Sequence, residues 1–352
     1  MTKYRSGLTE LPTYDVHVKE YDIKVDANES NLNLPPLVQE RVVNRLGYLA
    51  FNRYPDSGMS LREEIADNFG LTTDNILLGN GSSELLEKLF FAFGGQGNSI
   101  VFPTPSFSMY NIYAKISDTK AVAVCLEENY TLIPGKVLAA AEDEQATLIV
   151  ICTPNNPTGN VVPLYDIEYI LKNAQCPVVI DEAYVEFHGI SAVSLLEKYD
   201  KLIICRTFSK AYGFASARIG YMLAAKDIIT MVAKTCMPFH VNALTLAAAE
   251  IVYQMRDEFI PVIKQTVAER QRMEEKLQTF KEIVVYPSET NFILIKLDKA
   301  NQLNEFLEQN SIGVRSFNNA PQLENCIRIT IGTPEENDVI FSKISEFINK
   351  ER

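Results

Sequence analysis

The chain has 352 residues, of which 47% are hydrophobic, and its formal net charge is -12 at pH 7. This length predicts two domains, and the composition is typical of a soluble globular protein. The acidic balance argues against a nucleic-acid partner, because phosphate contacts need clustered Lys and Arg. No apolar run is long enough to cross a membrane, so no membrane partner is expected either.

Cysteine and histidine usage argues against a disulfide framework and against a metal centre. The six cysteines are widely spaced, with no C-x-x-C pair, and we expect buried, reduced thiols. The three histidines are scattered along the chain, so no metal is expected. The N-terminal residues lead into no signal-peptide core, which predicts a cytoplasmic protein.

Seven short apolar runs predict the strands of one sheet. They begin at Asn75, Ser99, Ala121, Thr147, Pro177, Leu202 and Ile219. Continuous apolar runs are typical of strands that are covered on both faces. The predicted fold class is therefore α/β, with a mostly parallel seven-stranded sheet sandwiched by helices. Between the first two runs, apolar residues at helical spacing predict a helix that Ser82 or Ser83 caps.

After Pro238 the pattern changes to mixed helices and strands, which predicts a smaller α+β C-terminal domain. The expected elements are helices at 241–255 and 259–280, a strand at 291–296, a helix at 302–309, strands around Val314 and Ile327, and a helix from Glu335. We expect three parts. They are an N-terminal arm (1–28) that packs on the small domain or on a dimer partner, a large domain (29–238) and a small domain (239–352).

The most informative polar residue is Lys210, which leaves an apolar strand into a Ser/Gly-rich turn. Thr207, Ser209 and Arg218 surround it in sequence with anion-binding groups. A lysine beside a phosphate site is typical of a Schiff-base lysine that binds pyridoxal phosphate. An ordinary strand-end lysine is the alternative, and the rest of the chain has to decide between the two.

Other polar residues also follow predicted strands, where the loops of a parallel sheet form ligand sites. The amides of Ser82 and Ser83 open a helix after a glycine-rich turn, which predicts an anion site. Asp181 ends an apolar strand and should face a cation. Asn156 lies in a turn at another strand end, and Phe107 can stack on a planar ring.

Seven motifs occur in a fixed order along the chain. They are Ala27-Asn-Glu-Ser, Asn52-Arg-Tyr-Pro-Asp, Gly79-Asn-Gly-Ser-Ser-Glu, Asn155-Asn-Pro-Thr-Gly, Asp181-Glu-Ala-Tyr-Val-Glu-Phe, Arg206-Thr-Phe-Ser-Lys-Ala-Tyr-Gly and Arg328-Ile-Thr-Ile-Gly-Thr. Together they resemble the fold type I, class II aminotransferases, and most of all the histidinol-phosphate aminotransferases. The resemblance runs from about residue 11 to the C-terminus.

This resemblance implies pyridoxal 5'-phosphate as cofactor and a role for each matching residue. Lys210 holds the cofactor as a Schiff base, and Asp181 pairs with the pyridine nitrogen. Tyr184 and Asn156 bond the ring hydroxyl oxygen, and Phe107 stacks on the ring. The residues implied to hold the phosphate are Ser82, Ser83, Thr207, Ser209 and Arg218, with Tyr54 reaching the phosphate bound by the other subunit of a homodimer with shared active sites.

The resemblance also implies a substrate site and a reaction. Arg328 and Asn156 are expected at the substrate, with Arg328 on the α-carboxylate of glutamate, and Arg315 and Tyr14 on a substrate phosphate. The implied reaction is transamination between L-histidinol phosphate and 2-oxoglutarate, in histidine biosynthesis, giving imidazole acetol phosphate and glutamate. Threonine-phosphate decarboxylase and an aromatic aminotransferase stay open. A DNA-binding regulator and a dinucleotide oxidoreductase are disfavoured, because no DNA-binding segment and no G-x-G-x-x-G fingerprint occur.

Overall fold

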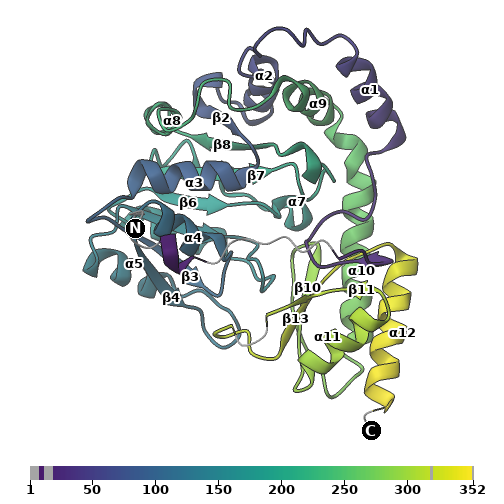
Figure 1. Cartoon of the computed structure of the whole chain (residues 1–352). Helices are drawn as coiled ribbons and strands as arrows, with labels where there is room; N and C mark the ends of the chain where they lie inside the picture. The colour runs from purple at the N-terminus through teal and green to yellow at the C-terminus, as the bar shows by residue number, and fades with distance from the viewer. Residues whose placement is uncertain (1–7, 12–18, 318–319, 351–352) are drawn as a thin grey trace, which may run out of the picture.

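The largest sheet of the protein has seven strands. The computed structural model describes residues 8–11, 19–317 and 320–350, and orders these strands β2-β8-β7-β6-β5-β3-β4 (Figure 1). Their bounds are β2 (Ile76–Gly79), β3 (Ser99–Thr104), β4 (Lys120–Cys125), β5 (Leu148–Cys152), β6 (Val178–Asp181), β7 (Leu202–Thr207) and β8 (Gly220–Ala224). β8 runs antiparallel to both its neighbours, and the other pairs are parallel. The predicted mostly parallel sheet is confirmed.

Helices pack on both faces of this sheet. One face is covered by α1 (Pro36–Leu46), α2 (Met59–Phe69), α5 (Pro134–Asp143), α6 (Leu164–Asn173) and α9 (Ala243–Gln254), and the other by α3 (Ser82–Phe93), α4 (Met109–Ile116) and α8 (Lys226–Ala233). Val178 joins the first core and Val179 the second. Since successive strand residues face opposite ways, Asp181 lies on the α3 and α4 face.

A second sheet of four antiparallel strands forms the lower right part of Figure 1. Its strands are β9 (Val284–Tyr286), β10 (Phe292–Lys296), β12 (Arg315–Ser316) and β13 (Cys326–Thr330). One face packs on α10 (Ile260–Leu277), α11 (Ala300–Gln309) and α12 (Pro334–Lys350). Ile327 and Ile329 enter this core, so Arg328 and Thr330 face the opposite side. β9 was not predicted.

Short elements complete the chain. β1 (Ile23–Lys24) pairs in parallel with β11 (Ile312–Gly313) as a separate two-stranded sheet, and so attaches the N-terminal segment to the chain between α11 and β12. The remaining helices are α7 (Val185–His188) and the 3-10 helices η1 (Leu8–Glu10), η2 (Thr73–Asn75), η3 (Ala192–Leu195), η4 (Ala215–Ala217) and η5 (Arg256–Phe259). None of the helices within the described ranges combines the length and apolar character that a bilayer crossing requires.

The two larger sheets have separate hydrophobic cores, but Leu294 of β10 and Cys326 of β13 belong to the core of the seven-stranded sheet. Leu246, Ala249 and Val252 of α9 belong to the core of the seven-stranded sheet. α10 contributes Met273 and Leu277 to the core of the smaller sheet. The three-part division of the chain at residues 28 and 238 stays a prediction.

The cysteines correct the expectation in part. All six are free, and four of them (Cys152, Cys176, Cys205 and Cys326) are buried as expected. Cys125, at the end of the edge strand β4, is exposed, and Cys236 is half-buried. An edge strand has a neighbour on one side only, so its last residue stays in reach of solvent.

The turn before α3 differs from the prediction that Ser82 or Ser83 caps this helix. The residue before the helix is Gly81, with a φ of 81°, and the two serines lie in the first turn. A φ of 81° combined with a ψ of 164° is a conformation that is adopted essentially only by glycine. Gly220 of β8 allows the backbone of Ser82 and that of Arg206 to pack closely against β8. A Cβ at position 220 would lie 2.5 Å from the amide nitrogen of Ser82 and 2.7 Å from the carbonyl oxygen of Arg206.

We therefore expect Gly220→Ala to lower the free energy of unfolding by about 2 kcal/mol, because backbone atoms on both sides would have to move. Chemical unfolding followed by circular dichroism measures this loss. Gly135→Ala is the matched control, since no atom lies within 4 Å of a Cβ built there. A stability of Gly220→Ala equal to that of the control would contradict the close-approach argument.

Candidate active site

Lys210 lies in the turn after β7, as predicted, and it is half-buried. Its Nζ donates a hydrogen bond to the carbonyl oxygen of Ala27 at 3.0 Å. Burial lowers the pKa of the Lys210 amine to about 7, and the positive charges of Arg328 and Arg218 add to this effect. A large fraction of the amine is therefore uncharged at neutral pH, as a nucleophilic or proton-transferring lysine requires.

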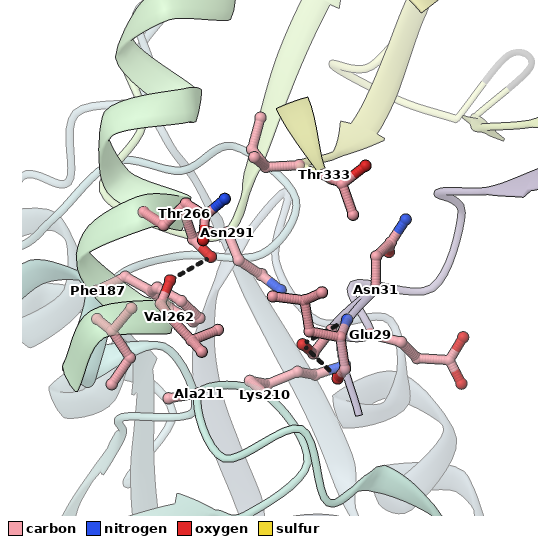
Figure 2. A pocket seen from close by; sticks show the side chains of 15 residues that line it. Glu29, Asn31, Phe187, Lys210, Ala211, Val262, Thr266, Asn291 and Thr333 are labelled. Carbon is pink, nitrogen blue, oxygen red and sulfur yellow. Dashed lines mark hydrogen bonds between the residues drawn. The ribbon is translucent and has the colours of Figure 1, made fainter. Parts of the chain in front are cut away.

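A pocket opens beside Lys210, where the N-terminal segment, α10 and the smaller sheet meet (Figure 2). Its lining includes residues 29–32, Ala211, residues of α10 from Val262 to Thr266, Asn291 and Thr333. Figure 2 shows Lys210 on one side of this pocket and Thr266 and Asn291 across from it. Of these residues, only Lys210 was predicted from the sequence to belong to the site. They come from segments far apart in the chain.

Asp181 ends β6 and is only 3% exposed. Its Oδ2 accepts a hydrogen bond from the Tyr110 hydroxyl at 2.7 Å, and its Oδ1 accepts one from the Ala183 amide at 3.2 Å. Burial raises the pKa of the Asp181 carboxyl to about 6, while the Tyr110 and Ala183 hydrogen bonds oppose this rise. Among the described residues Asp181 has no ion pair. The cation that it was predicted to face is therefore not a described protein group.

The contact of Tyr110 with Asp181 was not predicted from the sequence, although Tyr110 holds Asp181 directly. It is fully buried on α4. The predicted stacking residue Phe107 meets the Tyr110 ring edge to face, with centroids 5.6 Å apart. The signal in the sequence was the three-residue spacing of two aromatic side chains at a strand end. Phe107, Tyr110 and Asp181 thus form one connected wall.

The five predicted phosphate-binding residues come together at the N-terminus of α3. The Thr207 hydroxyl donates to Ser209 Oγ at 3.0 Å, and Arg218 Nη1 reaches the same Ser209 oxygen at 3.4 Å. Arg218 also lies against the turn that leads to Ser82 and Ser83, because a Cβ on the preceding glycine would be 2.7 Å from Arg218 Nη2. Helix amides, hydroxyls and a guanidinium group are the kinds of donor that can bind an anion together.

Arg328 and Asn156 also come together. Arg328 Nη1 donates to Asn156 Oδ1 at 2.6 Å, and Nη2 donates to the carbonyl oxygen of Asp26 at 2.6 Å. The guanidinium carbon lies 5.3 Å from the centroid of the Phe292 ring. Arg328 is 8% exposed. Its guanidinium plane is therefore fixed from several sides, as recognition of a planar carboxylate requires.

Tyr184 is buried near Lys210, with the Lys210 Nζ 6.0 Å from its ring centroid. Its hydroxyl oxygen accepts a hydrogen bond from Asn28 Nδ2 at 2.9 Å. Asn28 is 1% exposed, and sequence analysis gave it no role. The only sequence feature that could have indicated a role for Asn28 was its place in the Ala27-Asn-Glu-Ser motif.

The remaining predicted residues lie at the edge of the site or outside it. Arg315 is exposed and pairs directly across β12 and β13 with Arg328, so both side chains leave the same face of the sheet. Tyr54 is 79% exposed and stacks on Phe239 with ring centroids 4.5 Å apart. Its hydroxyl makes no hydrogen bond within the described part of the chain. Tyr14 lies outside the described residues.

Comparisons with known proteins agree with this arrangement. The family model described as "Aminotransferase class I and II" matches residues 23–344. A histidinol-phosphate aminotransferase of Thermococcus gammatolerans is 39% identical over 96% of this chain and 95% of its own length, and one of Clostridium novyi is 37% identical over 95% and 94%. The crystal structure of histidinol-phosphate aminotransferase from Sinorhizobium meliloti in complex with pyridoxal-5'-phosphate has a TM-score of 0.91 at 25% identity, covering 100% of this chain and 99% of that one.

Removal of the Tyr110 hydroxyl should raise the pKa of Asp181 above about 6, because its hydrogen bond stabilises the ionised carboxylate. For Tyr110→Phe we expect a rise of about one to two units, the value of one charge-assisted hydrogen bond. Carbon-13 NMR of labelled aspartate in the protein alone measures it. Tyr113→Phe removes another buried hydroxyl of α4 and should leave Asp181 unchanged. Equal shifts in both variants would refute the direct effect.

Proposed function

Because the chain belongs to the class I and II aminotransferase family, we propose that it transfers an amino group between L-histidinol phosphate and 2-oxoglutarate with pyridoxal 5'-phosphate as cofactor. The observation that carries the proposal is the placement of Lys210, Asp181 and an anion site at one edge of the sheet. The relatives named histidinol-phosphate aminotransferases, which match nearly the whole chain, support the choice of substrate. The product would be imidazole acetol phosphate, in histidine biosynthesis.

The residues present fit this cofactor. Asp181 is a buried carboxylate that lacks a cation among the described groups, as a partner for a protonated ring nitrogen should. Lys210 is the amine that would bind the aldehyde, and Phe107 would cover the ring. When bound, the cofactor supplies an electron-accepting ring that stabilises negative charge on the substrate. The residues that would hold its phosphate and ring oxygen are Ser82, Ser83, Thr207, Ser209, Arg218, Tyr184 and Asn156.

Lys210 has a second role in the proposal, as the proton carrier. With a pKa of about 7, its free amine can take a proton from the substrate Cα and return it at another carbon. Arg328, held by Asn156 and Asp26, would bind the α-carboxylate of glutamate through its planar fork. Substrate binding would thus come from a strand of the smaller sheet, and proton transfer from the turn after a strand of the larger one.

Arg315 supports a phosphorylated substrate. Two arginines directly opposite each other on β12 and β13 repel, and an anionic ligand between or beside them relieves that repulsion. Arg315 is exposed, so it is free to reach a group at the mouth of the site. We assign it the substrate phosphate, together with Tyr14 from the N-terminal arm.

Arg315→Ala should reduce the single-turnover efficiency of the histidinol-phosphate half-reaction by about 10- to 150-fold, as expected for one charge-assisted contact. The glutamate half-reaction should change much less. The absorbance of the bound cofactor reports each half-reaction. Lys296→Ala removes an exposed cation at the end of β10 and serves as the control.

Three results would count against the assignment. Equal losses in both half-reactions of Arg315→Ala would remove its phosphate-specific role. Release of carbon dioxide from threonine phosphate, in place of ketone from histidinol phosphate, would favour the decarboxylase. A preference of the unmodified enzyme for phenylalanine over histidinol phosphate would favour an aromatic aminotransferase.

We further propose a homodimer in which Tyr54 acts on the phosphate bound by the other subunit. Three aromatic residues between α1 and α2 are strongly exposed, Tyr48 at 87%, Phe51 at 77% and Tyr54 at 79%. Exposed apolar surface of this extent is typical of an interface. The Tyr54 ring stacks on Phe239, and its hydroxyl makes no hydrogen bond among the described residues, so it is available to a partner subunit.

The dimer predicts complementation between two inactive variants. Tyr54→Phe and Lys210→Ala, refolded together, should regain up to about a quarter of the wild-type activity, because half of the dimers are mixed and each of these has one intact site. Refolding each variant alone is the control. If mixed dimers form, as shown by differential tagging, and no activity returns, Tyr54 acts within its own subunit.

We also propose a cytoplasmic location. All six cysteines are free, including the exposed Cys125. Free thiols at the surface are typical of a reducing compartment. A cytoplasmic location agrees with the small-molecule amino donor and 2-oxo acid that the enzyme would use.

A further inference from the structure

Three consecutive residues, Asp26–Asn28, each contact a different residue of the candidate active site. The carbonyl oxygen of Asp26 accepts a hydrogen bond from Arg328 Nη2 at 2.6 Å, and the carbonyl oxygen of Ala27 accepts one from Lys210 Nζ at 3.0 Å. The side chain of Asn28 donates from Nδ2 to the Tyr184 hydroxyl at 2.9 Å. A segment that only passed beside the site would not need to contact a different site residue at each of three successive positions.

The smaller sheet holds this segment in place. The amide of Thr330 on β13 donates to the carbonyl oxygen of Val25 at 2.9 Å, and the amide of Asn28 donates to Thr330 Oγ1 at 3.0 Å. Asn291, just before β10, donates from Nδ2 to the carbonyl oxygen of Asn28 at 3.1 Å. The segment is thus fixed to the smaller sheet while it contacts Lys210 and Tyr184, which follow strands of the larger one.

The orientation of the Asn28 side chain is determined by its partners. Thr330 Oγ1 donates to Asn28 Oδ1 at 3.2 Å, so the amide nitrogen must face Tyr184. The backbone of Asn28 has a φ of 54°, a conformation that asparagine, aspartate and glycine adopt most easily. Both the residue type and its rotamer therefore suit this position.

This orientation has a consequence for the Tyr184 proton. A tyrosine hydroxyl has one proton to donate and lone pairs that accept. The Asn28 amide can only donate, so the Tyr184 proton cannot point at Asn28 and must point to another acceptor. The residues that face Tyr184 with titratable or charged groups are Arg328, Cys152, Asp181 and, over the ring, Lys210.

We propose that Asn28 is a positioning residue that directs the Tyr184 proton toward the ring oxygen of the bound cofactor. This inference rests on the proposed role of Tyr184 as a ligand of that oxygen. A directed donor stabilises negative charge on the oxygen, so the visible chromophore of the bound cofactor loses its proton at lower pH. Without Asn28 the hydroxyl is free to rotate and donates to the ring oxygen for only part of the time.

The test is a pH titration of the visible absorbance of the holoenzyme, which requires no turnover. We expect Tyr184→Phe to raise the midpoint, and Asn28→Gly to raise it by about half to one pH unit, the effect of weakening one neutral hydrogen bond. The double variant should titrate like Tyr184→Phe alone, because Asn28 acts only through Tyr184. Glycine is chosen because it tolerates the positive φ.

Three further variants separate the effect of Asn28 from a general disturbance of the segment. Asn33→Ala removes an exposed amide farther along the same segment, whose Oδ1 accepts from the Leu34 amide, and it should leave the midpoint unchanged. Thr330→Val releases the Asn28 side chain, so it should raise the midpoint, and Thr330→Ser should restore it. Thermal unfolding verifies that each variant is folded.

The possible outcomes distinguish a failure of the Asn28 inference from a failure of the proposed role of Tyr184 on which it rests. A wild-type midpoint in both Asn28→Gly and Thr330→Val would overturn the positioning role. So would an Asn28→Gly shift that persists undiminished in the Tyr184→Phe background. An unchanged midpoint in Tyr184→Phe itself would instead refute the role of Tyr184, whatever Asn28 does.

Discussion

The parallel register of three central strands is the constraint on which the site depends. Asp181 pairs in register with Cys152 on β5 and with Cys205 on β7. All three are buried, so the carboxylate is flanked by two thiols and has little access to water. The loops that leave these strand ends carry Asn156 and Lys210, and they therefore start from the same edge of the sheet.

The opposite face of the same strands holds this edge together. Glu182, next to Asp181, accepts from Arg206 of β7, with Arg206 Nη2 2.8 Å from Glu182 Oε2, and both are buried. The Ser191 hydroxyl also donates to Glu182, at 2.9 Å. Loss of one partner from such a buried pair would leave an uncompensated charge. The pair thus fixes the ends of β6 and β7 while the adjacent residues, Asp181 and Thr207, face the ligand side.

Burial moves the pKa values of two site residues toward each other. The pKa of Asp181 rises to about 6 and that of Lys210 falls to about 7. At neutral pH the carboxylate therefore remains mostly charged while much of the amine is uncharged. A single physical cause, desolvation, prepares one group to hold a cation and the other to accept a proton. Tyr110 limits the shift of the first group, and Arg328 increases the shift of the second.

The local sequence was sufficient to predict the seven strands of the larger sheet, since continuous apolar runs leave few alternatives. It also identified Lys210 and Asp181, because an ionisable side chain directly after such a run needs a ligand or a partner. The contacts of Tyr110 with Asp181 and of Asn28 with Tyr184 arise only in the tertiary structure. The partners lie 71 and 156 positions apart in the chain, and hydrogen bonds over such separations follow from how strands and sheets pack. Local pattern records which residues are buried or polar, but only packing decides which of them meet.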